Sequence, residues 1–352
     1  MKLIDITDLR TIIGTLGVPE FNRRVLDTLE SHFMRWNEFQ KTPRHASHFV
    51  NGVIELMPCS DERYYSFKYV NGHPSNPLRG KLSIVAFGVL ADADSGYPLL
   101  MSEMTLLTAF RTAGTAALAA KYLARPDSEV LAMVGTGAQA EFQFNALSDI
   151  FPLQSVRFYD IDRRAMNRFG DYLRSNATIR QKKCLSAAEA VADADIIVTA
   201  TGDRRRARLF NHECVRHGVH INALGGDCPG KTEIDPELVR KSKLVVEFLD
   251  QTSHEGEIQN LENPLVHAEL WELVSGRKCG RETELEITLF DSVGFALEDF
   301  AILKLVYDLA GQLRLGSEID LIPEPEDPKN LFGVLDLPNR ADSKSAINFN
   351  VR

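Results

Sequence analysis

A glycine-rich turn between a β-type run and a helical run is the clearest chemical signal in the sequence. The run VLAMV at 130–134 leads directly into Gly135-x-Gly137-x-x-Ala140, and a helical pattern begins at about Gln139. In this context the first glycine permits a sharp turn, the second lets backbone amides approach a pyrophosphate, and the small third residue allows close packing of helix on strand. The helix N-terminus adds N–H groups that attract phosphate. The spacing therefore predicts a dinucleotide site.

An aspartate at the end of the next β-type run favours NAD over NADP. Asp160 follows VRFY, where a carboxylate accepts hydrogen bonds from the adenosine ribose hydroxyls and repels a 2′-phosphate. Two observations leave the alternative open. Arg163 and Arg164 follow closely and could bind that phosphate, and an acidic residue at a strand end is often only a cap. The predicted cofactor is NAD.

A second candidate for chemistry is Asp227, in the loop GGDCPGKTE at 225–233. The glycines of this loop let the backbone crowd closely around a ligand. On composition alone the aspartate could equally be a turn residue. Its place just after the β-type run HINAL favours a functional role, because ligands of open α/β sheets bind beyond the carboxyl ends of the strands.

Three charged side chains lie in apolar surroundings. Lys68 falls in an alternating β-type run, Arg111 in an otherwise apolar helical run, and Glu55 between apolar neighbours in VIELM. Burying such a charge costs free energy unless an opposite charge pairs with it. We therefore expect each side chain to meet an opposite charge or to face water. For Arg111 the alternative to a ligand is a structural ion pair with Glu103 or another internal carboxylate.

Hydrophobic periodicity indicates the elements that must position these residues. Two amphipathic helices, broken at Gly17-Val18-Pro19, are predicted between Ile6 and Gln40. Antiparallel β-type runs are predicted between Arg44 and Pro98. An Ala- and Leu-rich helix over 105–123 leads into a region, from Val130 onward, where strand and helix patterns alternate. This alternation predicts a parallel sheet covered by helices on both faces. A last apolar helix, at about 295–313, is predicted to return to the first domain.

The overall composition is that of an ordinary globular protein. The chain has 352 residues, of which 44% are hydrophobic and 25% charged, so it is long enough for two domains. Its formal charge of −9 argues against a nucleic-acid partner, whose phosphates need a cationic surface. No stretch approaches the roughly 20 apolar residues of a membrane span, and the N-terminus is not typical of an export signal. Five scattered cysteines without CxxC spacing are typical of reduced thiols, which predicts a cytoplasmic protein.

Several segments resemble the ornithine cyclodeaminase/μ-crystallin family. They are VIELMP at 53–58, FKYVNGHP at 67–74, FRT at 110–112, GGDCPGKTE at 225–233, EGEIQ at 255–259 and FDSVGFALED at 290–299. The similarity covers nearly the whole chain. The segments GGDCPGKTE and FKYVNGHP look like the cyclodeaminase branch rather than the ketimine reductases or alanine dehydrogenases. Departures from the family pattern are Ser253-His254 and the basic run at 204–206.

This resemblance implies a fold and a division into domains. The implied fold class is α/β, with a Rossmann-type NAD-binding domain plus an α+β domain for substrate binding and dimerisation. We expect the Rossmann-type domain to cover residues 123–299, and the second domain to cover 1–122 and 300–352. A homodimer is also implied, and the polar tail after about residue 336 is expected to pack loosely.

The resemblance also implies a reaction. The family's cyclodeaminases convert L-ornithine to L-proline and ammonia, with NAD taking up and returning a hydride, in proline formation and in ornithine and arginine catabolism. The chain would then be a cyclising ammonia-lyase. Three alternatives stay open: an NAD(P)H-dependent cyclic ketimine reductase of the μ-crystallin type, a cyclodeaminase for lysine or another diamino acid, and a protein that only binds the dinucleotide.

Residue roles follow from the matching motifs. Asp227 is implied as the catalytic acid/base, with Glu55 at the substrate's amino end and Lys68 also in the catalytic set. The resemblance implies that Arg44, Lys68 and Arg111 bind the α-carboxylate of the substrate. The planar fork of arginine suits a carboxylate, and lysine adds a point charge. Arg44, after Thr42-Pro43, could instead be exposed. The implied substrate contacts are Arg44, Gly52, Lys68, Arg111 and Val293.

The cofactor contacts that the resemblance implies are spread over both domains. They are Ser83, Arg111, Gly135, Gly137, Ala138, Gln139, Asp160, Thr201, Ala223, Leu224, Gly225, Gly226, Lys231 and Ser292. No metal is expected, because the spacings of His45, His48 and His73 match no ligand motif.

Overall fold

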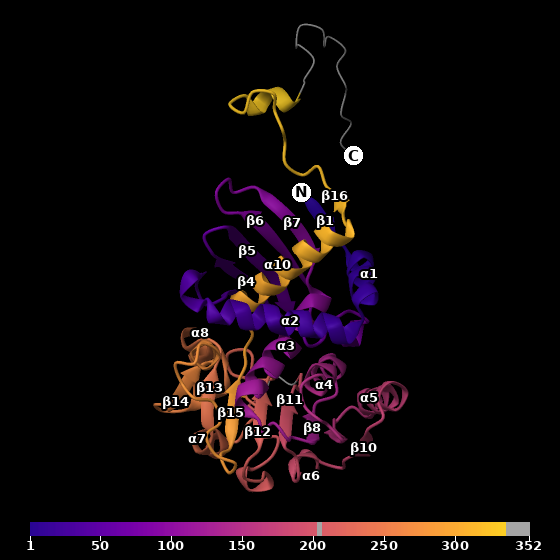
Figure 1. Ribbon diagram of the computed structural model, residues 1–352, viewed down its shortest axis with the longest axis vertical. Helices are drawn as coiled ribbons and strands as arrows, with labels where there is room; N and C mark the ends of the chain where they lie inside the picture. The colour runs from indigo at the N-terminus through magenta and orange to yellow at the C-terminus, as the bar shows by residue number, and fades with distance from the viewer. Residues whose placement is uncertain (203–205, 336–352) are drawn as a thin grey trace.

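Two eight-stranded sheets form the framework of the computed structural model, which describes residues 1–202 and 206–335 (Figure 1). The first sheet lies above the second in Figure 1, and helix α2 (Val18–Met34) lies across the molecule between them. In the described ranges, no helix has the length and apolar character needed to cross a membrane. Arg204 and Arg205, and the predicted tail, lie outside the described residues, whereas Arg206 bridges to Thr232.

The first sheet takes strands from both ends of the chain. Its order is β16-β1-β7-β6-β5-β4-β2, with β3 also paired to β4. All pairs are antiparallel except β1 with β7, so the antiparallel runs predicted between Arg44 and Pro98 are confirmed. The strands are β1 (Lys2–Ile4), β2 (Gln40–Lys41), β3 (His45–Phe49), β4 (Gly52–Ser60), β5 (Tyr64–Gly72), β6 (Ala86–Asp92), β7 (Pro98–Glu103) and β16 (Ser317–Glu318).

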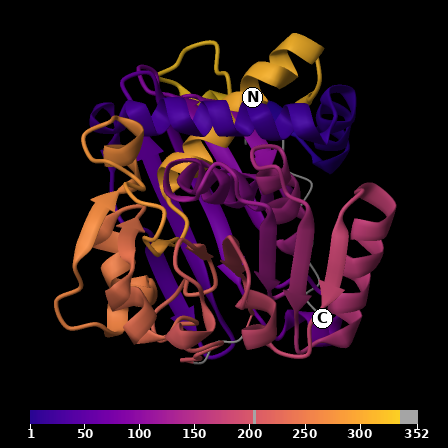
Figure 2. The same cartoon turned by 60° about the horizontal axis from the view of Figure 1, so that its bottom comes forward.

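The second sheet is parallel throughout, which confirms the predicted Rossmann-type fold. Its order is β10-β9-β8-β11-β12-β15-β13-β14, and the edge strands lie on opposite sides of the molecule in Figures 1 and 2. The order reverses between β8 and β11, and ligands of such sheets bind in the crevice at this point. The strands are β8 (Val130–Val134), β9 (Ser155–Tyr159), β10 (Arg180–Lys183), β11 (Ile196–Thr199), β12 (His220–Ala223), β13 (Lys243–Val246), β14 (Val266–Glu269) and β15 (Thr288–Asp291).

Helices cover both faces of the second sheet, as predicted. Leu131 and Met133 of β8 pack on one face with side chains of α4 and α5, whereas Ala132 and Val134 pack on the other with α6 and α7. The remaining helices are α1 (Ile6–Leu16), α3 (Thr105–Leu123), α4 (Ala140–Ser148), α5 (Arg163–Asn176), α6 (Ala187–Val191), α7 (Pro236–Lys241), α8 (Leu249–Glu255), α9 (Leu270–Val274) and α10 (Ala296–Leu313), with 3₁₀ turns η1 (Trp36–Glu38), η2 (Asn76–Arg79), η3 (His212–Cys214), η4 (Glu257–Asn260) and η5 (Leu331–Leu335).

Local sequence explains where the first two helices begin and end. Asp5 caps α1 by accepting hydrogen bonds from the amides of Thr7 and Asp8. Gly17, with φ of 80°, ends α1 in a conformation that L side chains rarely adopt, and Pro19 fits the first turn of α2. The predicted break between two amphipathic helices is therefore confirmed.

Helix α3 ties the two sheets together. Phe110 and Leu118 pack in the core of the first sheet, and Ala113 and Ala117 pack in a core of the second. Most of α3 is buried, and Arg111 in its first half is itself only 5% exposed. This helix thereby holds Arg111 at the boundary between the two layers.

The division of the chain into domains stays a proposal. Strands of the first sheet lie within residues 2–103 and 317–318, and strands of the second within 130–291, which supports the predicted boundaries. The predicted boundary at residue 300 nevertheless falls inside α10, which begins at Ala296. A single continuous helix therefore carries the chain back to the first sheet, where it packs on β4, β5 and β6.

Candidate active site

The glycine turn after β8 has the geometry that its spacing predicts. Gly135 has φ of 94°, and a Cβ there would lie 2.5 Å from the carbonyl oxygen of Ala200. Gly137 faces open space, because no heavy atom lies within 4 Å of the position that its Cβ would take. Ala140 is fully buried at the start of α4. The turn is thus closed toward the protein and open toward a ligand.

Asp160 lies beside this turn, directly beyond the end of β9. Its Oδ2 accepts hydrogen bonds from the backbone amide of Thr136, at 2.6 Å, and from the Thr136 hydroxyl, at 3.1 Å. Arg168 of α5 supports the same turn by donating to the carbonyl oxygens of Thr136 and Gly137, at 2.7 and 3.1 Å. Asp160 is therefore joined directly to the glycine turn, and its contact with a ribose stays a prediction.

The other predicted cofactor residues of the second sheet follow the carboxyl ends of neighbouring strands. Thr201 follows β11, and Ser292 follows β15. Ala223 is the last residue of β12, and Leu224, Gly225 and Gly226 follow it. The backbone amide of Ser292 donates to the carbonyl of Ala223 at 3.0 Å, so two of these strand ends are joined directly. Lys231 meets Asp227 at 3.0 Å. Parallel strands thus gather these residues at one edge.

Gly52 and Ser83 are brought together by His73, apart from the charged residues. The ring of His73 occupies the space beside Gly52, where a Cβ would collide with it, and the His73 amide donates to the carbonyl of Ser83 at 2.8 Å. Ser83 lies in the loop before β6. Within the described ranges, neither residue hydrogen-bonds to the charged side chains of the site, and their ligand contacts stay predictions.

Lys68 and Arg111 share one buried carboxylate. The Nζ of Lys68 lies 2.9 Å from Oδ1 of Asp299, and the Nε of Arg111 lies 3.1 Å from the same oxygen. Arg111 also donates from Nη1 to Glu298 at 2.7 Å. The structural ion pair considered for Arg111 is therefore present and uses internal carboxylates other than Glu103, because Glu103 accepts from the first amides of α3.

These two cations keep donors that the protein does not use. An ammonium offers three N–H donors, and among the described residues Lys68 donates only to Asp299. The Nη2 of Arg111 likewise donates to no described residue. Burial and the neighbouring Arg111 lower the pKa of Lys68 to about 8. A small anion that offers two oxygens would satisfy these donors and restore the favourable charge on Lys68.

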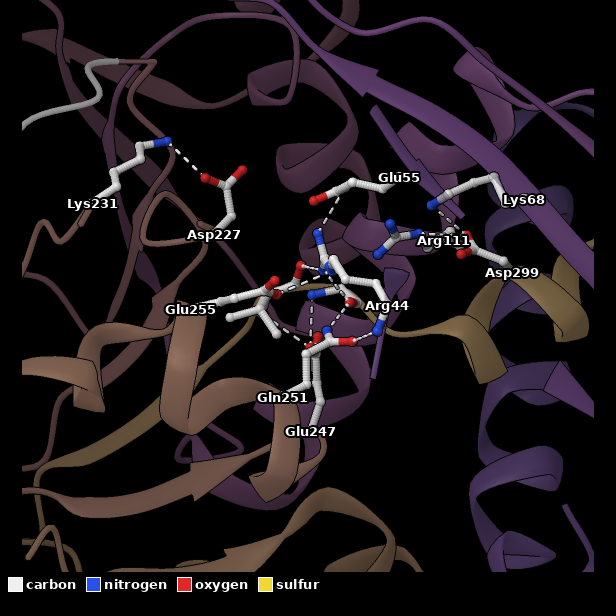
Figure 3. Close-up of polar contacts among 12 residues, drawn as sticks. Arg44, Glu55, Lys68, Arg111, Asp227, Lys231, Glu247, Gln251, Glu255 and Asp299 are labelled. Carbon is white, nitrogen blue, oxygen red and sulfur yellow. Dashed lines mark hydrogen bonds and ion pairs between the residues drawn. The ribbon is translucent and has the colours of Figure 1, made fainter. Parts of the chain in front are cut away.

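Arg44 is buried, so its exposure, the alternative considered from sequence, is wrong. Its guanidinium contacts Glu55 at 3.1 Å, Glu255 at 3.0 Å and the carbonyls of Val293 and Gly294 at 2.5 and 2.6 Å (Figure 3). Glu55 thereby meets the buried positive group that its apolar neighbours require. Because protein acceptors occupy most of the donors on Arg44, its role as a ligand of the substrate carboxylate stays a prediction.

Glu255 is a site residue to which sequence reasoning assigned no role. It lies at the end of α8, in the segment EGEIQ, whose resemblance was the only signal. Burial raises its pKa to about 7; the positive charge of Arg44 opposes this rise, and the negative charges of Glu55 and Asp227 add to it. Its Oε2 has no hydrogen-bond partner among the described residues. This carboxyl group can therefore exchange a proton near neutral pH.

Asp227 lies on the open side of the cluster. Its side chain is 45% exposed, and Figure 3 shows it between Lys231 and the group formed by Glu55, Arg44 and Glu255. Burial lowers the pKa of Lys231, but Asp227 and Glu233 oppose this effect, and the net result is a raised pKa. Asp227 also contributes to the raised pKa of Arg44, so its charge reaches the cluster. The predicted acid/base is thus accessible and close to other proton carriers.

A buried glutamate fixes the turn that Arg44 contacts. Glu247 accepts from the Ser292 hydroxyl at 2.6 Å and from the amides of Val293 and Gly294 at 3.0 and 2.7 Å. Burial and the nearby Glu247 raise the pKa of Glu298 well above its ordinary range. Sequence reasoning identified neither glutamate individually, because only the fold brings the ends of β13 and α10 together.

The arrangement combines unused cationic donors, proton carriers and a dinucleotide turn. The donors of Lys68 and Arg111 suit a carboxylate, and Asp227, Glu55 and Glu255 can move protons at a nearby amine. Within the described ranges, no group of three or more His, Cys, Asp or Glu side chains is arranged to hold a metal ion. The site is suited to acid/base and hydride chemistry on an amino acid.

The raised pKa of Glu255 predicts a pH-dependent contribution to stability. Between pH 4.5 and 7 the folded protein retains a proton that the unfolded chain releases, so this contribution is lost as the pH rises. We expect the stability of the wild type relative to Glu255→Gln to fall by up to about 3 kcal/mol across this window. Denaturant unfolding at several pH values measures it. Glu262→Gln, at an exposed position, is the control, and a pH-independent difference for Glu255→Gln would contradict the prediction.

Known proteins match this chain in both sequence and fold. The ornithine cyclodeaminase/mu-crystallin family matches residues 13–313. An ornithine cyclodeaminase from Agrobacterium fabrum is 47% identical over 335 residues, which cover 95% of this chain and 94% of that protein.

Solved structures extend the match to the whole architecture. An archaeal alanine dehydrogenase dimer with bound NAD superposes with a TM-score of 0.84 and 34% identity, over 92% of this chain and 99% of that one. A lysine cyclodeaminase, described as recognising L-lysine, L-ornithine and L-2,4-diaminobutyric acid, superposes with a TM-score of 0.88 and 28% identity, over 95% and 99%. The chain therefore belongs to the ornithine cyclodeaminase/mu-crystallin family.

Proposed function

We propose that this protein is an NAD-dependent ornithine cyclodeaminase, which converts L-ornithine to L-proline and ammonia in proline formation and ornithine catabolism. The observation that carries the proposal is the pair Lys68 and Arg111, buried with unused donors in the same group of charged side chains as Arg44 and Asp227 (Figure 3). Family membership and the 47% identity to a protein of that name support the same activity.

The substrate's α-carboxylate binds to Lys68 and Arg111. Each oxygen of a carboxylate accepts a charge-assisted hydrogen bond, and the two cations offer spare donors side by side. Arg44 contributes positive charge from the adjoining position, while Glu55 attracts an amino group of the substrate. Gly52 and Val293 are proposed to line the substrate's chain.

The residues at the strand ends fit NAD. The open space at Gly137 admits a pyrophosphate, and Asp160 lies beside the same turn to hold the adenosine ribose. Ala138, Gln139, Thr201, Gly225, Gly226, Lys231 and Ser292 complete the proposed set, with Ser83 reaching from the other domain. When bound, NAD supplies hydride removal and return at the substrate's α-carbon, so no external oxidant is consumed.

Asp227 and its neighbours handle protons. In the overall reaction the δ-nitrogen replaces the α-amino nitrogen on the α-carbon, and that α-amino nitrogen leaves as ammonia. A free alkylamine has a pKa of about 10, so the δ-amine must lose a proton before it forms the new bond. Asp227, partly exposed and close to Glu255, accepts that proton and returns one to the departing nitrogen.

Two other functions use the same site. A lysine cyclodeaminase would need a deeper pocket, but one methylene changes binding by only about 1–3 kcal/mol, and the similar lysine enzyme is itself described with ornithine. A cyclic ketimine reductase would consume NADH stoichiometrically. The closer identity to an ornithine cyclodeaminase favours the first proposal.

We also propose a homodimer, formed through the outer face of the first sheet. On β5 the inward residues Ser66, Lys68 and Val70 are buried, whereas Tyr65 on the opposite face is 43% exposed. Leu56 of β4 is 42% exposed, and Tyr69 stacks on Phe87 across the sheet. An apolar sheet face of this kind suits a second copy, and the similar alanine dehydrogenase is described as a dimer.

Buried free thiols at Cys59 and Cys184 fit a cytoplasmic setting.

The proposed activity predicts a mass balance and a dependence on Asp227. Purified protein with L-ornithine and catalytic NAD is expected to release one ammonia per proline without accumulating NADH. The Asp227→Asn variant is expected to lose about 10²- to 10⁴-fold in kcat while retaining NAD binding, because it loses only proton transfer. Amino-acid analysis and NADH absorbance measure both.

A matched control uses the same chemical change elsewhere. Asp250→Asn alters an exposed aspartate on α8 and is expected to leave kcat unchanged. Normal turnover in Asp227→Asn would reject its role. Stoichiometric NADH consumption with a cyclic imine, and no proline from ornithine, would instead select the reductase.

The open space at Gly137 predicts a selective loss of cofactor binding. A methyl group at residue 137 meets no protein atom, so Gly137→Ala is expected to fold normally but to weaken NAD binding at least about tenfold by blocking the pyrophosphate. Calorimetric titration with NAD and a thermal unfolding curve measure the two effects. Gly14→Ala, equally unobstructed but on α1, serves as the control. Unchanged affinity in Gly137→Ala would contradict the proposed cofactor position.

The proposed interface predicts that one charge on the sheet face dissociates the dimer. Leu56→Glu places a carboxylate at the centre of the exposed apolar face and is expected to yield monomers at micromolar concentration. Leu185→Glu, at a position that is 91% exposed and away from that sheet, is expected to remain dimeric. Sedimentation velocity distinguishes the two. A dimeric Leu56→Glu variant would place the interface elsewhere.

A further inference from the structure

Three buried carboxylates lie beneath the loop that carries Asp227. Glu233, Glu257 and Asp291 are all nearly or completely inaccessible to solvent. No described residue forms an ion pair with Glu233, and burial raises its pKa. Burial of a carboxyl group without an ion-pair partner costs several kcal/mol in general. The neighbouring groups that Glu233 contacts therefore indicate its role.

Glu233 connects two of the strand ends that hold the proposed cofactor residues. Its Oε1 accepts from the backbone amide of Thr201 at 2.8 Å and also from the Thr201 hydroxyl. Thr201 follows β11, while Glu233 lies at the end of the loop that follows β12. One carboxyl group therefore sets the separation between these two segments.

The same carboxyl group explains why residue 225 is glycine. A Cβ at Gly225 would collide with all three atoms of the Glu233 carboxyl group, which are the three heavy atoms nearest to that position. The φ of Gly225 lies outside the left-handed region, so an alanine would suffer no backbone strain there. The packing of Glu233 is therefore sufficient to require glycine at this position.

A second carboxyl group repeats the arrangement one residue further along. Glu257 accepts from the amides of Glu233 and Ile234 at 2.8 and 2.9 Å, and it fills the space where a Cβ at Gly226 would lie. Glu257 therefore holds the backbone of Glu233 in place. The two glycines immediately before Asp227 therefore lie against these two side chains, Gly225 against Glu233 and Gly226 against Glu257.

We infer that Glu233 is a positioning residue that fixes the Thr201 turn against Gly225 and thereby sets the affinity for NAD. This inference rests on the proposed NAD site but not on the identity of the amino-acid substrate. Glu233 acts through its neighbours. Thr201 and the loop beginning at Gly225 touch the cofactor, whereas Glu233, buried behind them, holds both in register.

The experiment is a double-mutant cycle between positions 225 and 233, read by NAD affinity. Gly225→Ala alone is expected to weaken NAD binding at least tenfold, because the methyl group displaces the loop from the carboxyl group. Glu233→Ala alone is expected to weaken it by a similar factor, because Thr201 loses its acceptor. In the double variant the methyl group occupies the vacated space, so the second substitution is expected to cost less than threefold.

Conservative variants separate positioning from general stability. Glu233→Gln keeps the acceptor for Thr201 and the shape, so it is expected to bind NAD within about threefold of the wild type. Gly225→Ala combined with Glu233→Gln is expected to remain as impaired as Gly225→Ala alone, because the collision persists. If Glu233→Ala does not fold, this second pair still tests the steric link.

Calorimetric titration with NAD and thermal unfolding curves give the two readouts for every variant. The inference is overturned if the losses at 225 and 233 add in the double variant, or if Glu233→Ala binds NAD as the wild type does. It is also overturned if unfolding midpoints alone change. Because no amino acid is present in the titration, a failure of the cyclodeaminase proposal would leave these binding results unaffected.

Discussion

The shared carboxylate of Asp299 is the interaction on which the site depends. It joins Lys68 of β5 and Arg111 of α3 to α10, so three elements from distant parts of the chain meet at one oxygen atom. Two cations this close would repel each other in a medium of low dielectric, and a single anion between them makes their burial tolerable. Glu298 also pairs with Arg111, yet Lys68 and Arg111 keep donors that no described residue uses, so the cluster can accept a further anion.

The second sheet contributes a different constraint, which is steric rather than electrostatic. Gly135 must be glycine because backbone lies where a Cβ would extend, and Gly225 must be glycine because a buried carboxyl group fills the adjacent space. Gly137 is unobstructed, so no protein atom requires glycine there, and the open space admits the proposed ligand. The three glycines thus report on turn geometry, on internal support and on ligand approach, respectively.

Several elements of the fold could be predicted from the sequence, because short stretches of residues determine them. The turn after β8, the break at Gly17 and the antiparallel runs each follow from a short stretch of residues. The carboxylates at Glu247, Glu255 and Glu298 could not be found in that way, because their partners lie far away in sequence. For the same reason the sequence could not identify which internal carboxylates pair with Arg111: Glu103 is near in sequence, but its side chain accepts from the first amides of α3.

The contacts of Arg44 bear on the release of the cofactor. Its guanidinium contacts Glu55 on the first sheet, Glu255 on α8 and the carbonyls at 293–294. Arg44 therefore links the first sheet to segments that follow strands of the second sheet. Separating the two layers to release a dinucleotide would break all of these contacts together. A catalyst that restores its redox partner within each turnover has no need of such release. The contacts of Arg44 can therefore hold the two layers together at little kinetic cost.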